Sequence, residues 1–434
     1  MMNFSTKAIL GTLTLASLLP SCRRDLMDQL PEKPNILLIM ADDLGFECLG
    51  CNGGTSYHTP NLDKLAETGV RFTHCYSTPL CTPSRVQIMT GKYNFRNYTA
   101  FGILEPGEKT FGHYLKEAGY TTGITGKWQL YGSTSQGELR ETGTYPTDAG
   151  FDEYCLWQID TVGSRYASPV IHYNLPEAEK FENQYGPDIF LSFISEFLEN
   201  NKEKPFFLYY PMVLPHDPHV PTPESKEWDM NRYQKENRFF KDMVEYMDKV
   251  IGIIVQNLED LGLRENTIVF FTGDNGTNRR IKSNIGVKEI KGGKGFPTTY
   301  GTHVPLIVNC PEAIPENKIC HELIDFTDFL PTLADLAGIS LPESDLFDGQ
   351  SLIPMLFGKT KKARDWIFCH YDCGKKQFPL ARYVQNKRYK LYESGSFFDI
   401  QEDEQELNPI DREHQTRKQK KVMQKFQEIL ERMN

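Results

Sequence analysis

Two stretches of this chain are unbroken apolar runs that end in acidic or amide residues. The first is "NILLIMADDLG" (35–45), and the second is "NTIVFFTGDNG" (266–276). An apolar run without alternation predicts a strand that is covered on both faces, which is typical of a parallel sheet flanked by helices. This feature favours an α/β fold built around a large central sheet.

Further strands and amphipathic helices alternate along most of the chain. We expect strands in 121–128, 204–216 and 303–310, and helices in 59–69, 109–120, 188–200, 232–261 and 331–338. From about residue 346 the pattern changes to short alternating strands and a final charged helix. We therefore predict a catalytic domain over 23–345, with a mixed or parallel sheet sandwiched by helices, and a smaller α+β subdomain over 346–434 on a short antiparallel sheet.

The first 22 residues have the pattern of an export segment. Lys7 precedes an apolar stretch (8–20) that is too short to span a bilayer, and "LLPSC" resembles a bacterial lipoprotein box with Cys22 as the lipidated residue. We expect an exported protein, in the periplasm or at the surface of a bacterium, and we leave open whether Cys22 anchors it to the membrane. The net charge of −10 gives a nucleic acid no basic surface to bind.

Ten cysteines raise the question of a structural metal or a disulfide framework. Two pairs are closely spaced, Cys48 with Cys51 and Cys369 with Cys373, but no histidine pair completes a zinc site. The chain is also too long to need a disulfide scaffold. Local disulfides or buried free thiols are therefore favoured over zinc.

Acidic side chains follow both of the opening apolar runs. Asp42 and Asp43 follow the first run, and Asp274 and Asn275 follow the second. In open α/β sheets ligands bind at the carboxyl ends of strands, and carboxylate and amide oxygens suit Ca²⁺, with Mg²⁺ as the weaker alternative. Either segment alone could be an ordinary turn, because these residue types favour turns. Their predicted position at one sheet edge favours a metal site.

The segment "PLCTPSRVQIMTGK" (79–92) places a cysteine at the start of a short predicted helix. Thr82 can cap this helix, Pro83 suits its first position and Gly91 ends it. Cys81 then lies at a helix N-terminus, where free N–H groups favour an anion, with Arg85 one turn further on. A thiolate nucleophile is one hypothesis for this cysteine, but the nearby metal-binding acids argue against it.

Six motifs together closely resemble the type I sulfatases, the formylglycine-dependent, arylsulfatase-like branch of the alkaline phosphatase superfamily. They are "ADDLG", "CTPSR", "GKW", "PHDPH", "DNG" and "GGKG", and the resemblance runs from Asn35 through "FFDIQEDEQELNP". In that family a maturation enzyme oxidises the motif cysteine, here Cys81, to Cα-formylglycine, and the hydrated aldehyde attacks the sulfur of a sulfate ester. Calcium would then be bound by a formylglycine oxygen at position 81 and by the two pairs Asp42–Asp43 and Asp274–Asn275.

The resemblance also implies roles for four basic residues. Arg85 would fix and polarise the hydrate, and Lys127 and Lys294 would bind sulfate oxygens and stabilise charge in the transition state. His216 would bind the bridging oxygen and assist the leaving alcohol. His219, three residues later, could line the substrate pocket or have a structural role.

The chain departs from the family pattern at Gln129. The family usually has "GKWHLG", whereas this chain has "GKWQLYG". A glutamine amide can hydrogen-bond a formylglycine hydroxyl but cannot accept its proton at neutral pH.

Weaker site candidates are His370 and the basic residues Arg279, Arg280, Lys288 and Lys291, which could bind a polyanionic substrate.

The sequence thus predicts a sulfatase that acts on sulfated carbohydrates. Two alternatives stay open at this stage. The same scaffold and nucleophile could serve a phosphodiester or phosphonate monoester hydrolase, and the substitution at Gln129 could mark a sulfated-glycan-binding protein with impaired catalysis.

Overall fold

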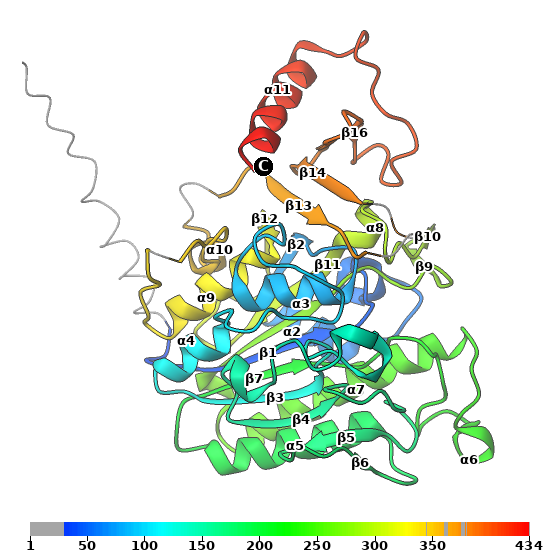
Figure 1. Cartoon of the computed structure of the whole chain (residues 1–434), viewed down its shortest axis with the longest axis vertical. Helices are drawn as coiled ribbons and strands as arrows, with labels where there is room; N and C mark the ends of the chain where they lie inside the picture. Colours follow the sequence, from blue (N-terminus) through cyan, green and yellow to red (C-terminus); the bar gives the residue numbers. More distant parts are fainter. Residues whose placement is uncertain (1–29, 344, 360–362, 375–377, 379, 434) are drawn as a thin grey trace, which may run out of the picture.

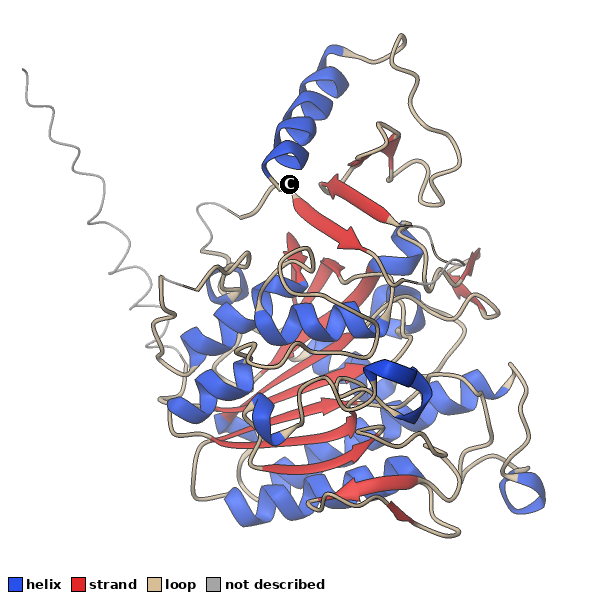
Figure 2. Ribbon diagram, in the orientation of Figure 1, coloured by secondary structure: helices blue, strands red, loops and turns tan. Residues whose placement is uncertain are grey.

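A ten-stranded sheet forms the centre of the computed structural model, with helices on both of its faces (Figures 1 and 2). The structure describes residues 30–343, 345–359, 363–374, 378 and 380–433, so the predicted export segment lies outside the described residues. The strand order is β12-β2-β11-β8-β1-β7-β3-β4-β5-β6. The strands are β1 Asn35–Ala41, β2 Val70–Tyr76, β3 Thr121–Lys127, β4 Glu153–Trp157, β5 Val170–Tyr173, β6 Glu179–Lys180, β7 Phe206–Pro211, β8 Thr267–Gly273, β11 His303–Asn309 and β12 Lys318–Asp325.

The two apolar runs that opened the sequence analysis are neighbouring strands. β1 pairs in parallel with both β7 and β8, and every residue of all three strands is buried. β11 runs antiparallel to β8 and to β2, which makes the sheet mixed. The predicted α/β sheet is therefore confirmed. Because β1 and β8 are in register, their carboxyl ends lie side by side.

Alternate residues of β1 enter two separate hydrophobic cores. Ile36, Leu38 and Met40 pack with helices α3 (Cys81–Thr90), α4 (Phe111–Glu117) and α9 (Phe329–Leu336). Leu37 and Ile39 pack on the other face with α2 (Pro60–Glu67), α5 (Gly186–Asn201) and α7 (Phe239–Asp260). The central strand is apolar throughout because both of its faces are covered.

The long helix predicted over 232–261 begins seven residues later than expected. Residues 228–231 form the separate short helix α6 (Trp228–Asn231), and α7 begins at Phe239, the first residue of its buried apolar face. The polar segment between them supplies no apolar side chain to that face. Within this segment the backbone N–H of Glu236 donates to the carbonyl of His219 and not to a helical i−4 carbonyl. The remaining short elements are β9 (Lys282–Ile285), β10 (Lys288–Lys291), α8 (Thr299–Thr302) and α10 (Ile353–Leu356).

The C-terminal part has its own sheet, as predicted. Four antiparallel strands, β13 (Ile367–Tyr371), β14 (Ala381–Gln385), β15 (Tyr389–Tyr392) and β16 (Phe397–Asp399), are covered by α11 (Arg417–Arg432). The apolar side of α11 joins the sheet in one core through Met423, Phe426, Ile429 and Leu430. Figure 1 shows this unit above the large sheet, with its first strand directed back toward the main domain.

The cysteines of the described residues all have free thiols, and eight of these nine are buried. Neither closely spaced pair forms a disulfide. Of the two alternatives to zinc, the structure therefore favours free thiols. Within the described part of the chain, no helix is both long and apolar enough to cross a membrane.

Candidate active site at the carboxyl edge of the central sheet

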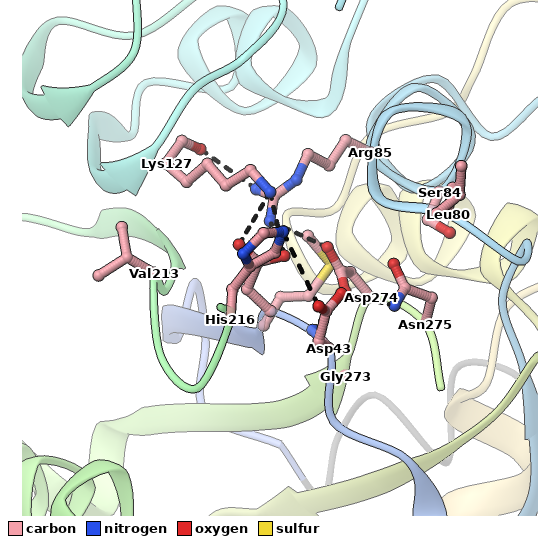
Figure 3. A network of polar contacts seen from close by, with 12 residues as sticks. Asp43, Leu80, Ser84, Arg85, Lys127, Val213, His216, Gly273, Asp274 and Asn275 are labelled. Atoms are coloured by element: carbon pink, nitrogen blue, oxygen red, sulfur yellow. Dashed lines mark hydrogen bonds and ion pairs between the residues drawn. The ribbon is translucent and has the colours of Figure 1, made fainter. Parts of the chain in front are cut away.

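The acidic residues predicted to converge do lie together at the ends of β1 and β8. Asp42, Asp43, Asp274 and Asn275 are fully buried. The backbone N–H of Asp43 donates to Oδ1 of Asp274 at 2.9 Å, and Nδ2 of Asn275 donates to Oδ1 of Asp43 at 2.9 Å. Figure 3 shows Asp43, Asp274 and Asn275 grouped between the ends of these strands. Parallel pairing of β1 with β8 therefore produces the acidic cluster directly.

Three cations from other elements neutralise this cluster. Nζ of Lys127, at the end of β3, lies 2.8 and 3.0 Å from the two carboxylate oxygens of Asp42. Nη2 of Arg85, from α3, lies 3.1 Å from Oδ2 of Asp274, and Nζ of Lys294 lies 2.5 Å from Oδ2 of Asp43. The Nη1 group of Arg85 also donates to the backbone carbonyl of Lys127 at 3.1 Å, which joins α3 to β3. Lys127 and Lys294, the two predicted sulfate-binding cations, thus each contact one predicted calcium ligand.

Burial sets the protonation of these carboxyl groups. Burial raises the pKa of Asp42, but the charges of Lys127 and Arg85 outweigh it and hold that pKa well below its usual value. Burial and the Asp42 charge together raise the pKa of Asp274 to about 7. Burial also leaves the pKa of Asp43 above its usual value, although Lys294 opposes the shift. Neighbouring carboxylates therefore oppose one another's ionisation, and a bound divalent cation relieves that repulsion.

The oxygen atoms of the cluster fit a hard cation. Within the described residues, Oδ1 of Asn275 is buried and accepts no hydrogen bond, so an acceptor with free lone pairs lies beside the carboxylates. Ligand atoms of Asp42, Asp43 and His216 lie within 4.8 Å of one another. Carboxylate oxygens with an amide oxygen are the donor set that Ca²⁺ and Mg²⁺ prefer.

Cys81 is the first residue of α3, and the predicted cap at Thr82 is wrong. The N-cap position is occupied by Leu80, which has extended backbone geometry and no side-chain cap. The hydroxyl of Thr82 instead accepts from the backbone N–H of Gly102 at 3.2 Å. Ser84 fixes the turn that enters the helix, because its hydroxyl accepts from the backbone N–H of Thr78 at 3.1 Å. Cys81 is nevertheless buried at a helix start, and Gly91 ends the helix in the left-handed region, as expected.

His216 faces the cluster as a neutral imidazole. Burial and the Lys294 ammonium lower its pKa well below the usual value. Its Nδ1 lies 2.5 Å from the backbone carbonyl of Asp217, which fixes the proton on Nδ1. Nε2 is then an acceptor, and it lies 3.0 Å from Nζ of Lys294.

His219 lies apart from this network in the described structure. Its Nδ1 is 3.4 Å from Oδ1 of Asn237, and its ring packs edge-on against Phe240 of α7, with 5.2 Å between ring centroids. The weaker basic candidates also have local partners. Arg279 lies over the rings of Phe296 and Phe378, and Arg280 forms an ion pair with Asp217. Lys288 and Lys291 lie on strand β10 of the β9–β10 hairpin.

Arg165 is a cation of the site that the sequence analysis missed. Its Nη1 lies 3.7 Å from Oδ2 of Asp42, and its guanidinium stacks over the ring of Trp157 at 3.8 Å. It comes from the irregular segment after β4, and no motif marks it. The only signal in the sequence is an arginine that follows a strand ending at the same sheet edge.

Gln129 adopts a backbone conformation that is rare for residues other than glycine. Its φ is 61°, and its backbone N–H donates to the carbonyl of Gln158, whose φ is also 61°. Left-handed backbone geometry costs a non-glycine residue about 1–2 kcal/mol. Two such glutamines joined by a backbone hydrogen bond therefore indicate that the surrounding structure holds the backbone in this conformation at this edge of the sheet. Both side chains line a cavity of about 520 Å³.

Comparison with known proteins assigns the chain to a family. Residues 34–339 match the sulfatase family model, and residues 294–434 match the model for the C-terminal part of N-sulphoglucosamine sulphohydrolase. Arylsulfatase A of Homo sapiens is 33% identical over 370 residues, which cover 77% of this chain and 70% of that protein.

Solved structures agree with this assignment. A protein solved in work on the metabolism of multiple glycosaminoglycans by Bacteroides thetaiotaomicron superposes with a TM-score of 0.75 at 25% identity, covering 93% of this chain and 99% of its own. The protein Ps i-CgsB, in complex with k-i-k-neocarrahexaose, gives a TM-score of 0.74 at 26% identity over 92% of each chain. With its buried cluster of acids and cations beside Cys81, this chain belongs to the sulfatase family and is a sulfuric ester hydrolase.

Proposed function

We propose that this protein hydrolyses sulfate esters of carbohydrates, with a formylglycine made from Cys81 and a calcium ion. The observation that carries the proposal is the convergence of Arg85, Lys127 and Lys294 on a buried acidic cluster beside Cys81. Two structural neighbours support the substrate class, because one concerns glycosaminoglycan metabolism and the other binds k-i-k-neocarrahexaose. A formylglycine-generating enzyme is then a required partner.

A hydrated formylglycine at position 81 would supply a geminal diol, one hydroxyl of which would be the nucleophile toward sulfur while the sugar alcohol is the leaving group. A sulfate ester is negatively charged, so the site must neutralise nucleophile and substrate together. Arg85 is placed to orient the group at position 81, since its guanidinium is fixed between Asp274 and the carbonyl of Lys127. Lys127 and Lys294 supply ammonium groups for the sulfate oxygens.

Calcium would be held by Asp42, Asp43, Asp274 and the free amide oxygen of Asn275. The bound cation supplies positive charge for the sulfate oxygens. With that charge opposite the carboxylates, the ammonium groups of Lys127 and Lys294 would be available to the substrate. Mg²⁺ fits the same donors less well, because it requires a stricter octahedral geometry.

His216 is suited to the leaving group, and Gln129 to binding rather than proton transfer. Nζ of Lys294 donates to Nε2 of His216 at 3.0 Å, and the remaining N–H donors of this ammonium can hydrogen-bond the departing sugar oxygen. Gln129 offers an amide that can bind a hydroxyl but carries no titratable proton. His219 is proposed only to support the loop that positions His216.

The first test concerns Cys81. When the protein is co-expressed with a formylglycine-generating enzyme, intact mass should show conversion of Cys81 to the aldehyde, and turnover of 4-nitrophenyl sulfate should exceed that of an aryl phosphodiester. Cys81→Ala should lower kcat/KM by at least about 10³-fold, as expected for loss of a nucleophile. Full activity with an unmodified thiol that iodoacetamide abolishes would support a thiolate enzyme. Faster phosphodiester turnover would support a phosphoester hydrolase, and a matured protein without turnover would support a glycan-binding protein.

The second test concerns the metal. Calcium at 100 times its Kd should stabilise the protein by about 2.7 kcal/mol, which raises the Tm by a few degrees. Asn275→Ala should remove most of this shift because it deletes a proposed ligand. Asn266→Ala, at an exposed position, is the matched control and should keep the shift. An equal calcium response in both variants contradicts the proposed ligand set. Differential scanning fluorimetry provides the measurement.

The third test concerns Arg165, which we propose adds a further positive charge to the sulfate-binding region. Arg165→Met keeps an apolar stem over Trp157 but removes the charge near Asp42, and kcat/KM for 4-nitrophenyl sulfate should fall about tenfold. Arg232→Met is the matched control, because Arg232 stacks on Trp228 at 4.8 Å at a half-buried site. The assignment fails if the two variants have the same kinetics.

The fourth test concerns export. We propose that residues 1–22 direct the protein out of the cytoplasm of a bacterium and that lipidated Cys22 anchors it to a membrane. Cys22→Ala should move the protein from the membrane fraction to the soluble fraction of the periplasm or medium. If the wild-type protein is already soluble outside the cell, plain secretion is correct and the anchor is not. Cell fractionation with immunoblotting distinguishes these outcomes.

A further inference from the structure

A cavity of about 520 Å³ lies next to the proposed catalytic cluster. Three separate parts of the chain line it: residues 98–102, the segment after β3 together with Gln158, and residues 370–374 of the C-terminal subdomain. The cavity is therefore shared between the large sheet and the smaller sheet.

Short contacts connect the walls of this cavity to both neighbours of Cys81. The backbone N–H of Gly102, in the first wall, donates to the hydroxyl of Thr82. Leu80, on the other side of Cys81, packs in one apolar cluster with Cys373 and Phe101. Gln129, in the second wall, is two residues from Lys127, whose ammonium contacts Asp42. A group that occupies the cavity therefore lies beside the reacting centre.

Three residues that line the cavity have polar atoms without partners. Within the described residues, the hydroxyl of Tyr98, Oε1 of Gln129 and Nδ1 of His370 are buried and make no hydrogen bond. Nearly all buried polar atoms in folded proteins are hydrogen-bonded, so three exceptions around one cavity indicate a polar occupant. Burial raises the pKa of Tyr98, so its hydroxyl stays a donor at neutral pH.

The two left-handed glutamines belong to the same wall. Trp128 and Gln129 donate their backbone N–H groups to the carbonyls of Trp157 and Gln158, so the ends of β3 and β4 continue side by side past the sheet. Both glutamines line the cavity in a backbone conformation that is usually retained at functional sites.

We propose that this cavity is the saccharide subsite, in which Tyr98, Gln129, Gln158 and His370 hydrogen-bond the hydroxyl groups of the sugar that carries the sulfate. The proposal rests on the proposed function, because it places the leaving alcohol of that reaction. A sugar ring offers donors and acceptors to all four side chains, whereas an aryl or sterol group leaves the buried polar atoms of Tyr98, Gln129 and His370 unpaired. Sites built to hydrogen-bond a hydroxyl reject analogues that lack it by large factors.

The test compares two substrate types in the matured enzyme with calcium. One is 4-nitrophenyl sulfate, whose leaving group cannot satisfy the polar wall, and the other is the best member of a panel of defined monosulfated hexoses and hexosamines. The readout is the ratio of kcat/KM for the saccharide to kcat/KM for the aryl sulfate. Tyr98→Phe and Gln158→Met should each lower this ratio about tenfold, because each removes one hydrogen-bonding group.

Tyr173→Phe is the matched control, because its hydroxyl bonds Glu196 at an exposed site away from the cavity. This variant should leave the ratio unchanged. The subsite proposal is overturned if Tyr98→Phe and Gln158→Met also leave the ratio unchanged, or if no saccharide exceeds 4-nitrophenyl sulfate. Remaining aryl sulfate turnover shows that a variant is folded. Absence of turnover on both substrates in the wild-type enzyme overturns the proposed function and the subsite together.

Discussion

The parallel pairing of β1 with β8 is the constraint on which the rest of the site depends. It brings Asp42, Asp43 and Asp274 together at one buried edge, where three carboxylates without counter-charge could not remain ionised. Arg85 and Lys127 must therefore reach the same place from α3 and β3, and the N-terminus of α3 is brought with them. The position of Cys81 is thus a consequence of charge neutralisation in the core.

Much of this arrangement was predictable from sequence because it follows from short local rules. Apolar runs identify β1 and β8, and parallel strands deliver their following residues to one edge, so four of the five predicted calcium ligands meet there as expected: Asp42, Asp43, Asp274 and Asn275. The cap at Thr82 was wrong because the true entry is fixed by the bond between Ser84 and Thr78, which no helix propensity encodes. Arg165 was missed since its position depends on stacking over Trp157, a contact between side chains that carry no motif.

The C-terminal subdomain has a more direct part in the site than its place at the end of the chain suggests. Leu80, next to Cys81, is buried in a cluster with Tyr371 and Cys373, so this small sheet packs against the start of α3. His370 lies on the same strand and lines the cavity beside Gln129. Changes in this sheet can therefore alter the choice of leaving group while the charged cluster stays constant. Under the proposed subsite, the same catalytic centre would serve different sulfated sugars.

A crystal structure of the Cys81→Ser variant with calcium and a sulfated saccharide tests the central claim most directly. The account predicts one ion bound by Asp42, Asp43, Asp274 and Asn275, with the sulfate group between that ion and the ammonium groups of Lys127 and Lys294. The sugar should occupy the cavity lined by Tyr98 and His370. An ion at another position, or a sulfate group bound away from these lysines, would contradict it.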